Sequence, residues 1–486
     1  MNGEALAIRR RLFGNEHPDV TTSLNNLANL DRHYGRLSEA EARAREALGI
    51  RRRVFGDEHL EVADSLRNLS IILGDAGKWS ESEAMARDVL AMRRKLLGPE
   101  DPSVASALAD VAWAAGARGK LDEAEALERE ALAMRRKLLP EEHSDVAKSL
   151  YLVGDRMRQQ GKVNEAYSVL SAALSIQRKL LGEDNPASLD SLRSLGLTLE
   201  AEGKLTESEA VHREALAGWR KRGQNETPQA LSQLESLVHV LAAQKKFGEA
   251  EQLLGEALTP AFIKRPSSVN LLAQRVELLA RQGRWQEAAT DAALALEHQP
   301  SNHDRYHTLA PLLAITHNRP AYEQLCRRIL ATFADTTNAV TADRMAKDCL
   351  LLPSSGIDLQ LIGRLADTAV TAGKDDWLMP YFEVSKAQSE YRQGHFADVV
   401  VWAQKAINRS DVLYLRAHAF AVLAMAHSQL GEKVTAQEML AKGNALVPII
   451  YPAENKADAW SGWIFARISL DESTSLIEPL AAAQGK

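Results

Sequence analysis

The apolar residues of the N-terminal half recur in a 42-residue unit, because near-identical segments begin at residues 4, 46, 88, 130, 172 and 214. Two apolar positions in each unit lie three residues apart, which is the spacing of one helix face. The first apolar set is Leu24, Leu66, Leu108, Leu150, Leu192 and Leu234, and the second is Leu27, Leu69, Val111, Val153, Leu195 and Leu237. A set of small residues comprises Ala40, Ser82, Ala124, Ala166, Ser208 and Ala250. The pattern predicts amphipathic helices that approach closely where the small residues lie.

Two glycine positions divide each unit into two helices. One glycine recurs at 35, 77, 119, 161 and 203, and another at 14, 56, 98 and 182, with Pro140 in its place once. Glycine commonly ends a helix because it adopts a left-handed backbone at little steric cost. The first helix of a pair begins after signals such as Pro18 and Pro186, where proline costs no hydrogen bond. Each unit is therefore predicted to be a helix pair.

Self-similarity of this length is typical of a stacked repeat protein, in which each unit contacts its neighbours. The strict register covers residues 1–258, with an incomplete first repeat, and residues 259–450 keep degenerate helix pairs without the period. Residues 451–486 form a last segment whose Trp460, Trp463, Ile464 and Phe465 are expected to cap the final layer. The predicted fold is an all-α solenoid of roughly a dozen helix pairs.

Composition and charge exclude several classes of partner. The 486 residues are 45% hydrophobic, 26% charged and 5% aromatic, with a formal net charge of -6. Such a mild imbalance gives no general attraction to nucleic acid or anionic lipid. No segment approaches the roughly 20 apolar residues of a membrane helix, and the N-terminus lacks the apolar core of a signal peptide. We expect a cytoplasmic protein with neither nucleic acid nor membrane as its partner.

No motif in the chain predicts catalysis, a cofactor or a metal. Cys326 and Cys349 lie in apolar helical contexts and lack ligand-spaced partners, so buried, unreactive thiols are expected. His303 and His307 have the i, i+4 spacing of some metal ligands, but no HExxH context accompanies them. An enzyme built on these histidines, or on the irregular stretch 314–373, is the least favoured interpretation.

Basic residues end each second helix, at positions 9–11, 51–53, 93–95, 135–137 and 178–179. They could bind an acidic partner. Cations at a helix C-terminus, however, complement its dipole by ~0.3–1 kcal/mol each. The following junctions supply acids, namely Glu16, Asp57, Glu100, Glu141 and Asp184. We expect these charges to neutralise one another along one edge.

The layout Leu-x-x-Leu-Ala, then Gly, then a helix containing Glu-Ala and Ala-Leu resembles the tetratricopeptide repeat. Its 42-residue form, with the junctions that begin at Gly14, Gly56, Gly98 and Gly182, is similar to the kinesin light chain subgroup. The resemblance covers about residues 4–258. It implies a right-handed superhelix in which the first helices line a concave groove for extended peptides.

The same resemblance implies a set of groove residues: Asn25, Asn26, Asn29, His33, Arg67, Asn68, Ile71, Trp113, Tyr151, Asp155, Arg158 and Arg193. Asparagine suits a peptide site because its amide both donates and accepts hydrogen bonds. The pattern Leu-Asn-Asn-Leu-Ala is complete only at residues 24–28, so a generic peptide clamp is supported in the first two repeats alone. Trp113 and Tyr151 either anchor an apolar or cationic side chain or pack between adjacent first helices, and the sequence leaves both open.

The resemblance implies a non-enzymatic scaffold that binds a protein or peptide ligand along its concave face, with the ligand's identity and the oligomeric state left open. The alternative is the C-terminal regulatory or sensory arm of a larger protein, because similar repeat tails follow bacterial serine/threonine kinase domains. No kinase motif occurs in the chain. Since the sequence starts inside a second helix, we expect residues upstream of it in the native protein.

Overall fold

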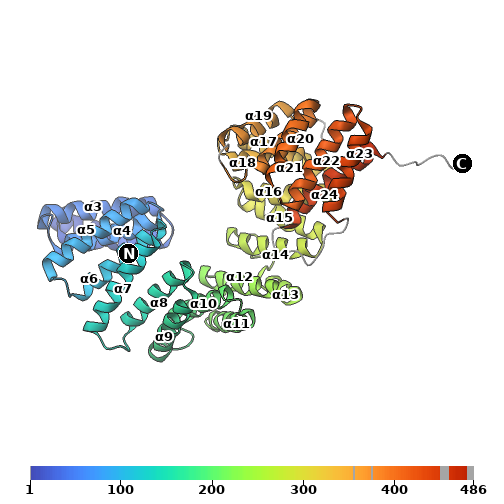
Figure 1. Cartoon of the computed structure of the whole chain (residues 1–486). Coiled ribbons are helices and arrows are strands. Elements are labelled where there is room, and N and C mark those ends of the chain that lie inside the picture. Colours follow the sequence, from blue (N-terminus) through green and yellow to red (C-terminus); the bar gives the residue numbers. More distant parts are fainter. Residues whose placement is uncertain (1, 354–355, 374–375, 449–458, 479–486) are drawn as a thin grey trace. The chain divides into compact units, whose positions relative to one another are not determined.

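The computed structural model describes residues 2–353, 356–373, 376–448 and 459–478. The described chain contains α-helices and one short 3-10 helix, and within each compact unit consecutive helices pack against each other (Figure 1). The chain divides into two compact units, Met1–Gln244 and Lys245–Lys486. The all-α fold predicted from the repeats is confirmed, whereas the predicted boundaries at residues 258 and 450 stay predictions.

Unit 1 consists of alternating second and first helices that follow the predicted register. The first helices are α2 (Pro18–His33), α4 (Leu60–Asp75), α6 (Pro102–Ala117), α8 (Ser144–Gln159), α10 (Pro186–Ala201) and α12 (Pro228–Ala243). The second helices are α1 (Asn2–Phe13), α3 (Leu37–Phe55), α5 (Trp79–Leu97), α7 (Leu121–Leu138), α9 (Val163–Leu181) and α11 (Leu205–Lys221).

Each first helix of unit 1 begins at a residue whose side chain accepts a hydrogen bond from the backbone of its first turn. These N-cap residues are His17, His59, Asp101, His143, Asn185 and Thr227. A capping acceptor satisfies a backbone N–H that the helix itself leaves unpaired. The junction histidines are therefore structural, and two of their rings also stack on Phe13 and Phe55.

The predicted core positions are buried. Leu24, Leu66 and Leu108 are at most 1% exposed, and the small residues Ala40 and Ser82 are fully buried. The two helices of a pair approach closely where a small residue on one helix faces a large side chain on the other. An added Cβ at Gly196 would lie 2.4 Å from the ring of His212 on the next helix. Glycine is therefore required there because the larger partner occupies the space that a side chain would need.

An arginine at the end of each early second helix connects that helix to the following first helix. The guanidinium of Arg51, only 8% exposed, donates to the backbone carbonyl of Glu61 at 2.8 Å and to Ser65 Oγ at 3.1 Å. Equivalent anchors are Arg9, Arg93 and Arg135. One residue of each of the first four basic runs is thus part of the packing between repeats, and Gln177, which accepts a hydrogen bond from Ser191, takes this position in the next repeat.

Many of the remaining basic residues pair with junction acids. Some of these acids lie in the following junction, as the sequence predicts, and others lie in the preceding one. Arg10, Arg94 and Arg178 instead pair with a glutamate of the next second helix. Arg53 pairs with Glu16 at 3.0 Å and Arg52 with Asp57 at 3.4 Å. The same arrangement recurs at Lys137–Glu100, Arg136–Glu141 and Lys221–Asp184. The expected neutralisation of this edge is confirmed.

Unit 2 continues the helix pairs with less regular lengths. Its helices are α13 (Phe247–Ala257), η1 (Pro266–Ser268), α14 (Val269–Arg281), α15 (Trp285–His298), α16 (His303–Ile315), α17 (Arg319–Phe333), α18 (Ala339–Leu350), α19 (Leu359–Ala372), α20 (Met379–Gln393), α21 (Phe396–Arg409), α22 (Leu413–Gln429), α23 (Lys433–Leu446) and α24 (Ala459–Ile477). The stretch 314–373, which looked irregular in sequence, contains helices α17 to α19. Both cysteines are buried, as expected, and burial raises the pKa of the Cys349 thiol.

The last helix, α24, lies across several first helices of unit 2. It packs on α22 and α23, as a capping segment would, and it also contacts α16. Trp460 Nε1 donates to Glu277 of α14 at 2.7 Å, and Glu472 pairs with Arg392 of α20. Residues 463–470 of this helix are buried on all sides. α24 therefore covers the face of unit 2 that is formed by the first helices α14, α16, α20 and α22.

Candidate functional site

The predicted groove residues of unit 1 lie on its first helices, and most of them contact the neighbouring first helix. We call the contacts between successive first helices the inner ladder; it comprises Asn25–Asn68, Arg67–Asp110, Asp155–Ser194 and Arg193–Ser232. In the described part of unit 1, no other helix lies over this face. The ladder is thus the polar surface that the first helices of unit 1 offer.

The ladder is tightest between α2, α4 and α6. Asn68 Nδ2 donates to Asn25 Oδ1 at 3.2 Å, and Arg67 forms a two-pronged ion pair with Asp110 at 2.5 and 3.1 Å. A paired guanidinium and carboxylate fix each other's orientation. These groups are therefore held in place before any ligand arrives, but their strongest interactions are already used.

A second part of the ladder joins α8, α10 and α12. Asp155 accepts hydrogen bonds from Ser194 at 3.0 Å and from Arg158 at 2.9 Å. Arg193 reaches Ser232 of α12 at 3.4 Å. Tyr151 packs against the core of these repeats, where burial, with a smaller contribution from the nearby carboxylates, raises the pKa of its phenol. The tyrosine is half-buried and packed at this position, and a part in ligand binding stays a prediction.

Trp113 fills space between repeats. Its ring lies edge-on to Trp79 with centroids 5.0 Å apart, and an added Cβ at Gly74 would lie 2.3 Å from it. The ring is therefore seated above a glycine of the preceding first helix. Of the two roles that the sequence leaves open, packing describes its position, and a part in ligand binding stays a prediction.

The open end of the face is on α2. Asn26, Asn29 and His33 are exposed, whereas Asn25 and Asn68 are half-buried and bonded to each other. Ile71 adds a partly exposed apolar side chain on α4. The two exposed asparagines present amide groups to solvent on the helix where the asparagine pattern is complete. Some of the predicted groove residues are thus exposed together on one surface, whereas others are bonded to each other in the inner ladder.

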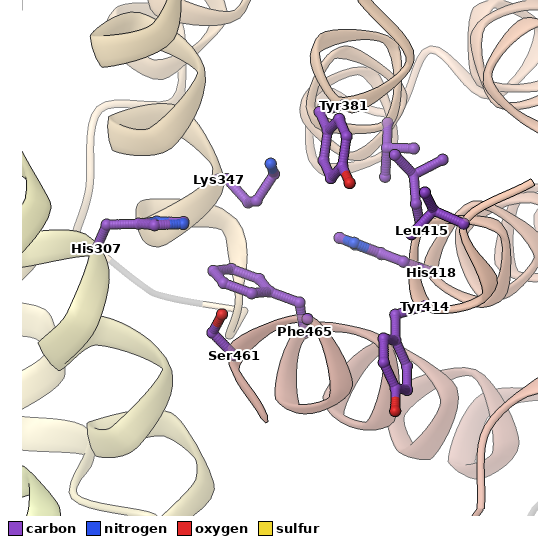
Figure 2. A pocket seen from close by; sticks show the side chains of 11 residues that line it. His307, Lys347, Tyr381, Tyr414, Leu415, His418, Ser461 and Phe465 are labelled. Atoms are coloured by element: carbon purple, nitrogen blue, oxygen red, sulfur yellow. The ribbon is translucent and has the colours of Figure 1, made fainter. Parts of the chain in front are cut away.

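In unit 2 the corresponding surface is covered, and a pocket of about 180 Å³ remains beside α24. Figure 2 shows that its labelled side chains come from five helices: His307 of α16, Lys347 of α18, Tyr381 of α20, His418 of α22 and Phe465 of α24. The Phe465 ring stacks on both His307 and His418, at centroid distances of 5.5 and 6.4 Å. The pocket is therefore the seam along which α24 packs.

The lysine and the two histidines that line this pocket already have polar partners, and those of the histidines are Asp348 and Gln388. Lys347 Nζ lies 3.0 Å from Asp343 and also over the rings of Tyr381 and Phe465. Burial, assisted by the positive charges of Lys347 and Arg392, lowers the pKa of His418 to about 3, so this ring is neutral near pH 7. A neutral ring and a satisfied ammonium match a packed interior.

The histidine pair weighed as a metal site does not converge. His307 Nδ1 lies 2.8 Å from Asp348, while His303 faces Arg344 at 3.4 Å, so a cation occupies the space near one ring. Among the described residues, one other group has metal-like spacing, namely Glu390, His395 and Asp398. The carboxylate of Glu390 is already paired with Lys386 and His395.

The covering role of α24 escaped the sequence interpretation. The aromatic residues of its first turns were recognised as unusual, but their partners lie up to 183 positions away along the chain. Because the second half lacks the strict period, no register related those partners to one another. One signal was present: residues 463–470 contain apolar residues on every side of a helix, which indicates a helix enclosed by others.

Among the helices that the structure describes, none combines the length and the apolar character that a bilayer-spanning segment needs.

Comparison with known proteins adds the family. The tetratricopeptide repeat model matches residues 3–53, 32–95, 76–137 and 145–221. A crystal structure of nearly identical TPR-like repeats of a Podosopora anserina kinesin light chain-type protein is 25% identical, covering 43% of this chain and 98% of that one, with a TM-score of 0.38. BtubC from P. vanneervenii is 20% identical over 46% and 89% of the two chains, with a TM-score of 0.41.

A tetratricopeptide repeat protein from Parabacteroides merdae is 16% identical, covering 58% of this chain and 98% of that one, with a TM-score of 0.37. No curated protein sequence matches the chain. The matched model segments coincide with the helix pairs of unit 1, and their helices carry the inner ladder. Residues 3–137 and 145–221 of the chain are therefore tetratricopeptide repeats, similar in sequence to kinesin light chain-like repeat arrays.

Proposed function

We propose that this protein is a non-enzymatic scaffold that binds a protein or peptide segment along the inner face of unit 1. The observation that carries the proposal is the contrast between the two units. The first helices of unit 2 are covered by α24, whereas no other described helix of unit 1 covers the inner ladder. One unit thus retains a surface for a partner, and the other has used its surface internally.

The chemistry of this face favours an extended backbone as ligand. Asn26 and Asn29 are exposed one helical turn apart on α2, and an amide can both donate to and accept from a peptide bond. The Arg67–Asp110 pair and the Asn25–Asn68 pair hold the neighbouring helices in register. Pre-organised polar groups lower the ordering cost of binding.

The test is selection of peptides from a displayed random library on the full chain, followed by calorimetric titration of the selected sequences. The double substitution Asn26→Ala/Asn29→Ala is compared with Asn164→Ala, which removes an exposed asparagine from the second helix α9. We expect the double variant to lose roughly tenfold or more in affinity, or about 1.4 kcal/mol, and Asn164→Ala to bind like the parent. Peptides that bind the double variant and the parent equally would place the site elsewhere.

A further inference from the structure

The outer face of unit 1 carries a repeated ion network that is interrupted in one repeat. On the second helices α3, α5, α7 and α11, a glutamate and an arginine four residues later form an ion pair. The pairs are Glu41–Arg45, Glu83–Arg87, Glu125–Arg129 and Glu209–Arg213, all at 2.7 to 2.8 Å. At the same positions of α9 the chain has Tyr167 and Ser171.

The arginine of this pair normally reaches the next repeat as well. Arg45 contacts Glu81 at 3.0 Å and Arg87 contacts Glu123 at 2.5 Å. The corresponding glutamate after α9 is Glu207, in the first turn of α11. Glu207 is exposed and has no ion-pair partner among the described residues, because the arginine that would reach it is replaced by Ser171.

The missing arginine coincides with a pocket of about 420 Å³ between α9 and α11 (helices shown in Figure 1). Its floor is apolar, formed by Leu174, Leu192, Leu195, Leu199 and Val211. Tyr167 and Ser171 form part of its wall, and the tyrosine is 41% exposed. The charged residues of the wall, Arg178 and Glu214, form an ion pair with each other. An aliphatic floor, an accessible aromatic ring and a nearby unpaired carboxylate are the three features that an arginine side chain uses.

The loss of the glutamate at position 167 is compensated inside the chain, whereas the loss of the arginine is compensated only in part. Lys204, whose equivalents Lys78 and Lys120 pair with the replaced glutamate, pairs with Glu202 at 2.7 Å and lies 6.0 Å from the centroid of the Tyr167 ring. Lys204 also attracts the carboxylate of Glu207 electrostatically, but the described residues place no cation at ion-pair distance from Glu207. Since Arg178 is paired with Glu214 and Lys204 with Glu202, the carboxylate of Glu207 leaves one negative charge in excess beside the pocket. This excess favours a cation that comes from outside the chain.

We propose that this pocket, lined by Tyr167, Ser171 and Val211, binds an arginine side chain of a partner protein. The partner's guanidinium would pair with Glu207 and lie near Tyr167, while its methylene stem would cover the leucine floor. This surface is on the second helices and is separate from the inner ladder. The inference therefore stands or falls independently of the proposed peptide site.

The test uses the full chain with isotope-labelled leucine and valine methyl groups, observed by NMR and titrated with N-acetyl-arginine amide. N-acetyl-citrulline amide, which has nearly the same shape without the charge, is the matched probe. We expect saturable shifts of the Val211 methyls with the arginine probe and markedly smaller shifts with citrulline. The Val211 signals are assigned with a Val211→Ile variant.

Two substitutions test the residues that carry the proposal. Glu207→Gln should weaken the arginine response several-fold, and Ser171→Arg, which restores the arginine of the other repeats, should abolish it. Glu81→Gln, at the equivalent position beside Arg45, should leave the response unchanged. Equal shifts with both probes, an unchanged response in Glu207→Gln or Ser171→Arg, or no shift of Val211 in the parent would each overturn the proposal.

Discussion

Replacement of Leu108 by alanine tests the assignment of the repeated leucines to the interior. Leu108 is fully buried on α6, in a cluster that includes Leu66, Val89 and Ala131. The change removes three carbon atoms, which at about 0.8 kcal/mol each contributes about 2.4 kcal/mol of lost transfer energy. A cavity adds to this cost when the neighbours cannot collapse into it, and leucine-to-alanine changes at buried sites cost about 3–5 kcal/mol.

The short side chains and helix backbones around Leu108 leave little room for collapse, so we expect about 3 kcal/mol or more. Because a solenoid opens locally, the suitable assay is hydrogen exchange of individual peptides, measured by mass spectrometry. A loss of about 3 kcal/mol should accelerate exchange of α6 and its neighbours on the order of 100-fold. Peptides of unit 2 serve as an internal reference.

The matched control is Leu96→Ala, which truncates a leucine that is 41% exposed near the end of α5. We expect it to change exchange by less than about 1 kcal/mol. If Leu108→Ala and Leu96→Ala accelerate exchange equally, the assignment of the leucine face and the energetic reasoning are both refuted.

Three further predictions concern buried groups of unit 1. Burial lowers the pKa of His212 to about 4 from its usual 6.5. The contribution of this residue to stability is therefore fully present above about pH 6.5, and on the order of 3 kcal/mol is lost as the pH falls toward 4. His212→Gln should remove this dependence of the unfolding free energy on pH, measured by urea titrations at several pH values. Burial raises the pKa of Glu128 to about 7, so stability should fall as pH rises from about 4.5 to 7, in opposition to His212, and Glu128→Gln should remove that decline in the same titrations. Gly196→Ala should destabilise the protein by about 1–3 kcal/mol because its Cβ would meet the His212 ring at 2.4 Å. Gly49→Ala should stabilise α3 by about 0.5–1 kcal/mol, since the nearest contact of its Cβ is the flexible end of Arg53 at 3.5 Å. Thermal unfolding of the two variants checks that the changes have opposite signs.

The strict period made the architecture of unit 1 predictable from sequence. Because the register is fixed, equivalent positions of every unit have the same environment. The position of Leu24 in one unit therefore identified the buried side of every first helix. The same logic identified the junction acids that neutralise the basic runs, but it did not identify which run each acid meets. Arg52 pairs with Asp57 of the following junction, whereas Arg53 pairs with Glu16 of the preceding one. Local signals were also sufficient for the helix starts, where His17 and its equivalents cap the first turns.

The groove residues were only partly predictable. Their place on the first helices follows from the repeat, but whether a side chain is free or bonded depends on the adjacent repeat. Arg67 meets Asp110 and Trp113 covers Gly74 because of the angle and spacing between helices, which the sequence of one unit does not contain. The exposed amides of Asn26 and Asn29 could be distinguished from the bonded amide of Asn68 only in three dimensions.

The sequence by itself determined the helix pairs, their register and their buried faces, because these depend on periodicity and on residues within one or two turns of each other. Tertiary structure alone decided which inner face stays open. α24 reaches Glu277 from Trp460 and Arg392 from Glu472 across long stretches of chain, and these contacts form only when the irregular pairs of unit 2 have stacked. Long-range packing of this kind leaves no period in the sequence, which is why the covered face of unit 2 became visible only in the folded chain.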